Sequence, residues 1–370
     1  MLLELPRPVF KSAIERLSVL SENRKVKVDA YTHIRLEMKG GRLLLSTFNQ
    51  TMRAEISIAE VCHEGQDMVC GLPLQQLRDF SSTLPEAHSV MLQTEDTGCK
   101  IHCGRAVLRT KLLLEDAFPR AMEIDGRPLD QAALGFRKTN LSFLFQSIGL
   151  VEHCVDTTSQ RQYAQGIIIT PESIVATDGM RLSQVPDEWV KPEKSIGLTQ
   201  ESVTRLQKMF KGCSEGGLLL RPGELFLTGG SITAVTRLAA WPIPNIKSAV
   251  PGSSSGKVSV LTEDLIHAIE RSLIVAEDNA PQTELEFTGH GFLRLKTEED
   301  GQVSEDTVSV EGLTPMTVRV NPKFLLAAAK SIESERAVFQ LKAPEAPLLI
   351  TNETGEHVNV IMPLNPAYGS

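Results

Sequence analysis

Apolar residues follow two alternating patterns along this chain. In six stretches a short apolar run leads into apolar positions at helical spacing, as at Leu265, Ile266, Ile269 and Leu273, and this spacing predicts an amphipathic helix. The predicted helices cover residues 7–20, 73–83, 137–150, 200–211, 262–276 and 321–332. Successive units start roughly 60–66 residues apart, which indicates an internal repeat.

Between the helices the pattern changes to strict alternation, which predicts half-buried strands. Gly-, Asp- or Pro-containing turns interrupt these segments, which span residues 41–59, 89–114, 216–240 and 284–310. Each unit is therefore one helix plus roughly four antiparallel strands. Helices that cover one face of such sheets define an α+β fold.

Pairs of units predict three domains with related structures. The expected boundaries are residues 1–126, 132–252 and 257–370. Two segments rich in turn-forming residues, Glu123–Ala133 and Pro251–Lys257, are predicted to be the linkers. Caps are also visible, because Thr262 precedes two acids and Asn321 precedes a proline.

Composition restricts the class of protein. Hydrophobic residues make up 41% of the 370 and charged residues 23%, which is ordinary for a soluble globular protein. No apolar run approaches the roughly 20 residues that span a bilayer, and six scattered cysteines suit a reducing compartment. We therefore expect a cytoplasmic protein without a membrane segment.

Charge is unevenly distributed between the predicted helices and the rest of the chain. The six helix windows hold twelve Lys or Arg and six acids, although the whole chain carries a net charge of −8. If the helices share one face, that face is basic and suits a phosphate backbone. On charge alone, ordinary solvated helix faces explain the pattern equally well.

Catalytic and metal-binding patterns are absent from the sequence. In "CKIHC" a strand would place Cys99 and Cys103 on one face and His102 on the other, so the three cannot hold one ion. "PGSSSGK" has the wrong glycine spacing for a phosphate-binding loop. We therefore expect no enzyme activity, no metal and no cofactor.

Four segments, in order, resemble one known family. "ATDGMRL" at Ala176–Leu182 is similar to that family's "ATDGHRL", and "EDAFPR" at Glu115–Arg120 and "RLAAWPIPNIKSAVP" at Arg237–Pro251 resemble the segments that close its first two domains. "VIMPL" at Val360–Leu364 resembles its terminal "VVMPM". The chain is thus similar to the bacterial sliding clamp family, the β subunit of DNA polymerase III. The resemblance implies three clamp domains in a head-to-tail homodimeric ring.

The resemblance also implies a role for the "ATDGMRL" loop, whose Asp178 and Arg181 could otherwise indicate acid–base chemistry. In the family this loop forms one wall of an apolar pocket for short linear motifs of polymerases and of the clamp loader. Asp178 is expected to brace the turn with its carboxylate. The pocket residues implied by position are Thr177, Gly179, Met180, Arg181, Leu182, Pro251, Asn321, Phe324, Val360, Met362, Pro363 and Leu364.

Two further sets of residues follow from the basic helices and the resemblance together. Residues expected to face duplex DNA are Arg7, Lys11, Arg24, Arg78, Arg137, Lys138, Arg205, Lys208, Lys211, Lys323 and Lys330. Residues expected at the dimer interface are Leu108, Thr110, Arg271, Ile274 and Val275, the last three on one helix.

The expected function is that of a processivity factor, which encircles DNA without reading its sequence. The alternative is a scaffold of the same fold that binds client peptides but forms no ring. Some positions depart from the family and indicate a divergent member. Met180 replaces a histidine, Ala164 replaces a larger apolar residue, and the chain continues past Leu364 as "NPAYGS".

Overall fold

The fold is taken from a computed structural model of the chain. The structure describes residues 2–21, 29–39, 41–65, 69–86, 88–95, 98–115, 118, 123–124, 127–128, 135–252, 254–276 and 281–364. Two compact units result, one of Met1–Leu144 with Glu201–Leu238 and one of Phe145–Gln200 with Ala239–Ser370. These units divide the predicted second domain, so the three sets of domain boundaries stay a prediction.

The first unit contains a five-stranded and a nine-stranded antiparallel sheet. The five-stranded sheet has the order β5-β1-β7-β8-β9, formed by Cys62–Glu64, Leu2–Pro6, Ser89–Thr94, Gly98–Cys103 and Ala106–Lys111. The nine-stranded sheet has the order β10-β6-β2-β3-β4-β20-β19-β18-β13. Its strands are Leu113–Leu114, Val69–Pro73, His33–Lys39, Arg42–Phe48, Met52–Ile58, Ile232–Arg237, Glu224–Gly229, Glu215–Arg221 and Arg137–Asn140. A separate hairpin pairs β11 (Glu123–Ile124) with β12 (Arg127–Pro128).

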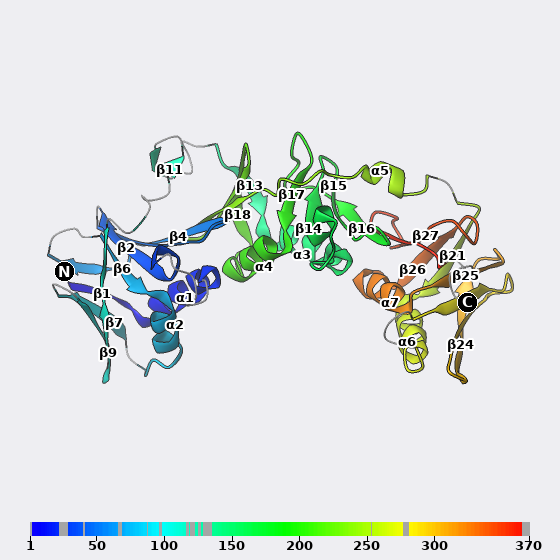
Figure 1. The fold of residues 1–370 in the computed structure, drawn as a ribbon, viewed down its shortest axis with the longest axis horizontal. Coiled ribbons are helices and arrows are strands. Elements are labelled where there is room, and N and C mark those ends of the chain that lie inside the picture. The colour runs from blue at the N-terminus through cyan, green and yellow to red at the C-terminus, as the bar shows by residue number, and fades with distance from the viewer. Residues whose placement is uncertain are drawn as a thin grey trace. The chain divides into compact units, whose positions relative to one another are not determined.

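Helices α1 (Arg7–Leu17) and α2 (Leu74–Ser82) pack against each other in this unit (Figure 1). Short 3-10 turns follow at Ser18–Leu20 and Asp29–Tyr31. Pro8 sits in the first turn of α1, where its missing N–H costs nothing. One face of α1, formed by Phe10, Ala13, Ile14 and Leu17, is buried, as its helical spacing of apolar residues requires.

Arg16 of α1 holds the end of helix α4 (Gln200–Met209). Its Nη1 donates to the carbonyl of Met209 at 2.6 Å, and its Nη2 donates to the carbonyl of Lys211 at 2.9 Å. The last carbonyls of a helix lack partners within the helix and carry partial negative charge. The guanidinium of Arg16 therefore satisfies carbonyl groups at the C-terminal end of α4.

A twelve-stranded sheet dominates the second unit. Its order is β17-β14-β15-β16-β28-β27-β26-β21-β24-β23-β22-β25. The strands are Ile196–Thr199, Gly166–Ile169, Ser173–Thr177, Arg181–Pro186, Val358–Ile361, Leu348–Thr351, Arg336–Leu341, Gly256–Leu261, Gln302–Glu311, Phe292–Glu299, Thr283–Phe287 and Met316–Val320. The helical segments are α5 (Ile246–Ala249), α6 (Thr262–Ser272), α7 (Pro322–Ser331), 3-10 turns at Glu152–Cys154 and Gln162–Gln165, and most of α3 (Leu141–Val151).

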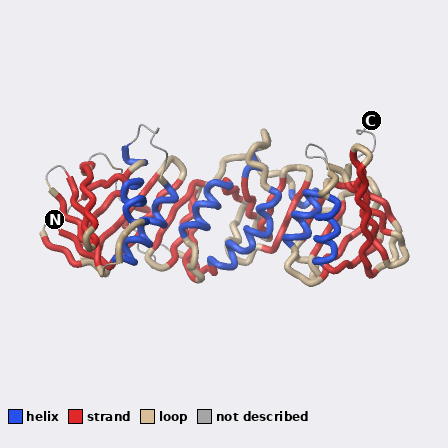
Figure 2. Tube along the Cα trace, turned by 90° about the horizontal axis from the view of Figure 1, so that it is seen from below, coloured by secondary structure: helices blue, strands red, loops and turns tan. Residues whose placement is uncertain are grey.

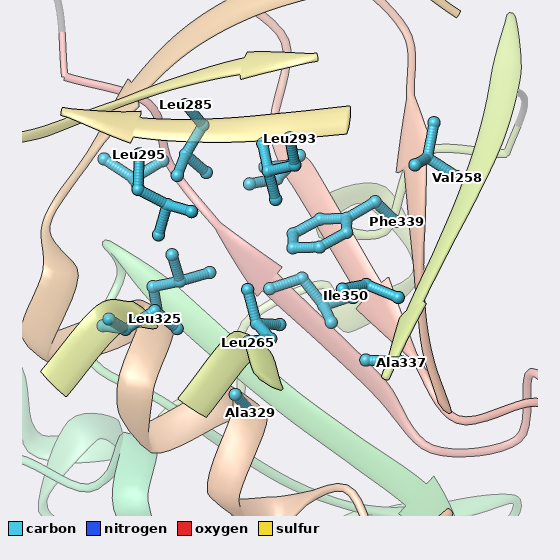
Figure 3. Close-up of a cluster of buried hydrophobic side chains, with 14 of the residues drawn as sticks. Val258, Leu265, Leu285, Leu293, Leu295, Leu325, Ala329, Ala337, Phe339 and Ile350 are labelled. Atoms are coloured by element: carbon cyan, nitrogen blue, oxygen red, sulfur yellow. The ribbon is translucent and has the colours of Figure 1, made fainter. Parts of the chain in front are cut away.

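The largest apolar core of this unit lies between α6, α7 and the sheet. Leu265 of α6 and Leu325 and Ala329 of α7 point at strand side chains that include Leu293 and Phe339 (Figure 3). Phe339 makes an edge contact with Phe287, with ring centroids 5.2 Å apart. Figure 2 shows helices lying side by side in each unit, and contacts between α1 and α2 and between α6 and α7 agree.

The structure confirms the α+β class and all six predicted helices, with two corrections to their limits. Helix α3 begins at Leu141. Arg137 and Lys138 instead lie on strand β13, where they pair with Leu218 and Gly217 of β18. Helix α6 ends at Ser272, so Ile274 and Val275 follow it in a turn. Thr262 is not a cap, since its hydroxyl donates to the carbonyl of Ser334.

Candidate functional site

The loop between β15 and β16 is braced by Asp178. Its Oδ1 accepts hydrogen bonds from the backbone N–H groups of Met180 and Arg181, at 2.8 and 2.9 Å. Its Oδ2 forms an ion pair with Nε of Arg181 at 2.9 Å. Thr177 adds a second brace, because its hydroxyl accepts from the N–H of Gly179 and donates to the carbonyl of Arg181. The expected role of Asp178 in the turn is confirmed.

Gly179 suits this turn chiefly through its backbone conformation, because the contact that a Cβ would make is with the movable end of an arginine side chain. Its φ of +92° lies in a region that side chains rarely tolerate. A Cβ at this position would also lie 2.0 Å from Nη1 of Arg161. Nη1 of Arg161 donates a hydrogen bond to the carbonyl of Asp178 at 3.3 Å, so the Arg161 side chain packs against the loop.

Met180 and Met362 form an exposed apolar surface beside this loop. Strand β16 pairs with β28, so that Leu182 lies opposite Val360, and the N–H of Met362 donates to the carbonyl of Met180 at 2.9 Å. The two methionines are 46% and 38% exposed. Leu182 and Val360 are buried in one cluster with Ile168, Val175, Ile246 and Leu349, and Tyr163, Ile243 and Val250 pack against it. We call Met180, Met362 and this cluster the methionine surface.

Arg181 also connects the loop to helix α7. Its guanidinium carbon lies 4.3 Å from the centroid of the Phe324 ring, a cation–π contact. Asn321 caps α7, since its side chain accepts from the N–H of Lys323. Arg181 is therefore held by a carboxylate on one side and an aromatic ring on another.

Of the other residues implied for the pocket, Pro251, Pro363 and Leu364 are half-buried. The N–H of Leu364 donates to the carbonyl of Arg319 on β25 at 2.8 Å, which fixes the chain after β28. Ala164 is fully buried. Residues 365–370 lie outside the described residues.

Sequence reasoning missed several members of this region. Arg161 closes the loop, and Tyr163, Ile243, Ile246 and Val250 pack at the cluster. The last three lie within the Arg237–Pro251 segment, from which only Pro251 was selected. The available signal in that segment was its three prolines and the apolar residues between them.

A buried polar group lies behind the methionine surface. Nε2 of His357 lies 3.1 Å from Oγ of Ser183 and 3.3 Å from Nδ2 of Asn359. Burial lowers the pKa of His357 to about 4. Burial also lowers the pKa of His153 to about 4, with the charge of Arg181 as a second cause. Both imidazoles are therefore neutral at physiological pH, so they act here as packed hydrogen-bonding groups.

The residues predicted to face DNA differ widely in their surroundings. Arg78, Lys138, Lys208, Lys211, Lys323 and Arg137 are exposed and Lys11 is half-buried. Arg7 instead donates to the carbonyl of Leu84 at 3.1 Å, and Arg205 pairs with Glu201 at 2.6 Å with its side chain only 17% exposed. Lys330 pairs with Glu270 at 2.7 Å. Arg24 lies outside the described residues.

Residues predicted at the dimer interface lie on two exposed features. Leu108 and Thr110 belong to β9, which ends the five-stranded sheet. The hydroxyl of Thr110 donates to Gln76. Ile274 is 78% exposed and Val275 is half-buried, while Arg271 forms an ion pair with Asp306.

The two segments that could have indicated metal or phosphate binding, "CKIHC" and "PGSSSGK", both belong to or lead into strands. Cys99 and Cys103 are buried on one face of β8, and His102 lies on the other face, as predicted. Gly256 and Lys257 of "PGSSSGK" begin strand β21. Within the described ranges, the structure holds no helix long and apolar enough to cross a membrane.

Known proteins match this chain at the levels of sequence and fold. The family model for the DNA polymerase III beta subunit, C-terminal domain, matches residues 247–365. The beta sliding clamp of Streptomyces coelicolor is 25% identical over 337 residues and covers 85% of each chain. That of Rickettsia felis is 23% identical over 379 residues, with 95% of this chain and 94% of the relative covered.

Solved structures agree along nearly the whole chain. The DNA polymerase III subunit beta of Pseudomonas aeruginosa has a TM-score of 0.88 at 18% identity, covering 99% of this chain and 100% of the other. The sliding clamp of Bartonella birtlesii has a TM-score of 0.86 at 22% identity, with 99% of both chains covered. The chain is therefore similar in sequence to beta sliding clamps, matches their C-terminal domain model over residues 247–365, and shares the fold of DNA polymerase III β subunits along nearly its whole length.

Proposed function

We propose that this protein is a DNA sliding clamp, which encircles duplex DNA and tethers polymerases to it. The observation that carries the proposal is the methionine surface, together with the similarity of the chain to sliding clamps. Met180 and Met362 expose apolar side chains above a buried floor, and Asp178 holds the adjoining loop in one conformation. An apolar site with few fixed polar groups suits an extended peptide.

The client peptide would bind at the methionine surface with little rearrangement of the protein. Asp178, Arg181 and Phe324 support one another through the ion pair and the ring contact, so the loop is already ordered. A preordered site avoids part of the entropy cost of binding. Once tethered, a polymerase has an effective concentration on the order of millimolar at the DNA that the clamp surrounds.

DNA contact would be electrostatic and independent of sequence. Arg78, Lys208 and Lys211 are exposed at the helices, where each can neutralise a phosphate. Phosphate contacts position a protein on DNA without reading its bases. The clamp needs this property because it must slide.

Ring closure would join two copies head to tail. Strand β9, with Leu108, has no further strand partner in the described part of its sheet, and Ile274 exposes a large apolar side chain. A heterologous contact of this kind can close into a ring, and pairing at β9 would cover an exposed strand edge. The clamp would work in the cytoplasm, with no catalytic step and no cofactor.

A loading experiment on circular DNA tests this proposal. The protein, a clamp loader and nicked plasmid are combined, and retained clamp is measured by gel filtration before and after cutting of the plasmid. A ring should stay on the circle and slide off the linear DNA, because only topology holds it. Peptide binding without any retention on circles would instead identify the non-ring scaffold.

A further inference from the structure

A pocket of about 180 Å³ lies in the first unit, away from the methionine surface in the sequence. It is formed where strands β3, β4, β19 and β20 begin or end, and β4 and β20 are paired there. Residues that line it include Tyr31, Asn49, Arg53, Glu224, Val235 and Arg237. None of them belongs to the residues predicted for client, DNA or dimer contacts.

Asn49 presents an amide donor at this pocket. Its Oδ1 accepts from the N–H of Thr51 at 3.0 Å, from the hydroxyl of Thr51 at 3.2 Å and from the N–H of Met52 at 2.8 Å. These donors fix the orientation of the amide, since a flipped NH2 group would face two N–H groups. Asn49 is only 8% exposed, and its NH2 group has no hydrogen-bond partner in the part of the chain that the structure describes. An unpaired donor of this kind can bind a ligand that accepts a hydrogen bond.

Two guanidinium groups lie beside this donor. Arg53 pairs with Val235 across β4 and β20, and Arg237 lies two residues further along, where its N–H donates to the carbonyl of Thr51. Diagonal neighbours of this kind lie about 7–8 Å apart at their backbones, within reach of long side chains. Among the described residues, neither arginine side chain has a hydrogen bond or ion pair. The two arginines outnumber the single carboxylate that lines the pocket, on a protein with a net charge of −8.

We propose that this pocket binds the phosphate group of a small phosphorylated molecule. Guanidinium groups bind phosphate oxygens through paired, charge-assisted hydrogen bonds. The Asn49 amide adds a neutral donor from a different direction. Val235 provides an apolar wall for the carbon part of the ligand, and the volume admits a small ester rather than a protein segment.

Glu224 limits what the pocket accepts. It lies opposite Arg237 on β19 and also lines the pocket. Its carboxylate would repel a second anionic group, so a monoester should bind more tightly than a ligand with several phosphates. The site therefore differs from a general anion-binding surface.

Binding of phosphate compounds to the full-length protein tests this proposal. The probes are inorganic phosphate, a ribose monophosphate and pyrophosphate, measured by isothermal titration calorimetry at constant ionic strength. Saturable binding of phosphate or of the ester is the expected result, and the relative affinity of these two probes shows whether the carbon part contributes. If neither phosphate nor the ester binds saturably at concentrations up to about 10 mM, the proposal is overturned.

Two variants locate the site. Arg53→Gln with Arg237→Gln should weaken binding at least about tenfold, because both charge-assisted contacts are lost. Asn49→Asp keeps the acceptor that holds the turn but replaces the donor with a negative charge, so it should abolish binding while the melting temperature stays close to the parent's. The matched control is Arg42→Gln with Arg105→Gln, two exposed arginines outside the pocket. Equal loss of binding in the control, or parental affinity in the pocket variants, would refute the assignment.

Discussion

The guanidinium of Arg181 lies over the ring of Phe324, 4.3 Å from its centroid. The same side chain pairs with Asp178 through Nε. The guanidinium of Arg181 therefore contacts both the loop after β15 and helix α7, which lies far along the sequence. The ion pair and the ring contact together restrict the side chain of Arg181 in the second unit.

Phe324→Ala should weaken binding of a client-type peptide by about tenfold. The change removes an aromatic face and the cation–π contact, which together contribute on the order of 1–2 kcal/mol. Fluorescence anisotropy with a labelled peptide measures the dissociation constant. Phe324→Tyr is the matched control and should bind like the parent, because the ring is retained. A parental affinity in the Ala variant would remove Phe324 from the site.

Gly179→Ala should distort the loop and reduce both stability and peptide affinity. The residue has a φ of +92°, and its Cβ would meet Nη1 of Arg161. The backbone strain alone costs about 1–2 kcal/mol. Adding Arg161→Ala should relieve the contact but not the strain, so the double variant should recover only part of the loss. Full recovery would show that the backbone conformation of Gly179 is unimportant.

Arg78→Ala with Lys208→Ala and Lys211→Ala should weaken retention on DNA and lower its salt dependence. Each lost phosphate contact should reduce the slope of log affinity against log salt by about one. The control changes Arg105, Lys194 and Lys342 to Ala, because these exposed residues lie outside the helices. An unchanged salt slope in the first variant would contradict a basic DNA-facing surface. Arg205 is omitted because it is mostly buried beside Glu201.

Ile274→Ala with Val275→Lys should produce folded monomers. Ile274 is 78% exposed, so its replacement should not disturb the core, whereas a lysine at an interface must be desolvated. Analytical ultracentrifugation at micromolar concentration measures the mass. Leu313→Lys is the control, because Leu313 is a similarly exposed residue of the same unit that was not predicted at the interface. A dimer that persists in the first variant would place the interface elsewhere.

His153 and His357 should make the protein less stable in mild acid. Burial lowers both pKa values from 6.5 to about 4, so the folded state resists protonation while the unfolded state accepts it. Their contribution is complete above pH 6.5 and is lost as the pH falls toward 4, by at most about 1.4 kcal/mol per pH unit for each histidine.

Urea unfolding at pH 7 and pH 5 tests the histidine prediction. The variant with His153→Gln and His357→Gln should lose much less stability between these two pH values than the parent. Replacement of His267, which is outside this buried group, provides the comparison. The same acid-induced loss in the double variant and the parent would show that other groups cause it.

Local sequence patterns were enough to predict the repeat, the six helices and the strands between them. These features depend on local periodicity, and the apolar face of α1 or α6 follows directly from residue spacing. Asn321 before Pro322 also marked the start of α7 correctly, since a cap acts on N–H groups of the next turn. The Asp178 turn was predictable for the same reason.

Contacts between distant segments establish which polar side chains are already hydrogen-bonded or paired and which are available to a ligand. Arg205 pairs with Glu201 one turn away in its own helix, whereas Arg16 of α1 binds carbonyls at the end of α4, far along the sequence. Arg137 and Lys138 were predicted to begin a helix, but they lie on a strand because they pair with β18. Arg161 over Gly179, and Asn49 beside Arg53 and Arg237, join segments whose contacts no local pattern encodes. Such contacts depend on sheet register and packing between distant parts of the chain.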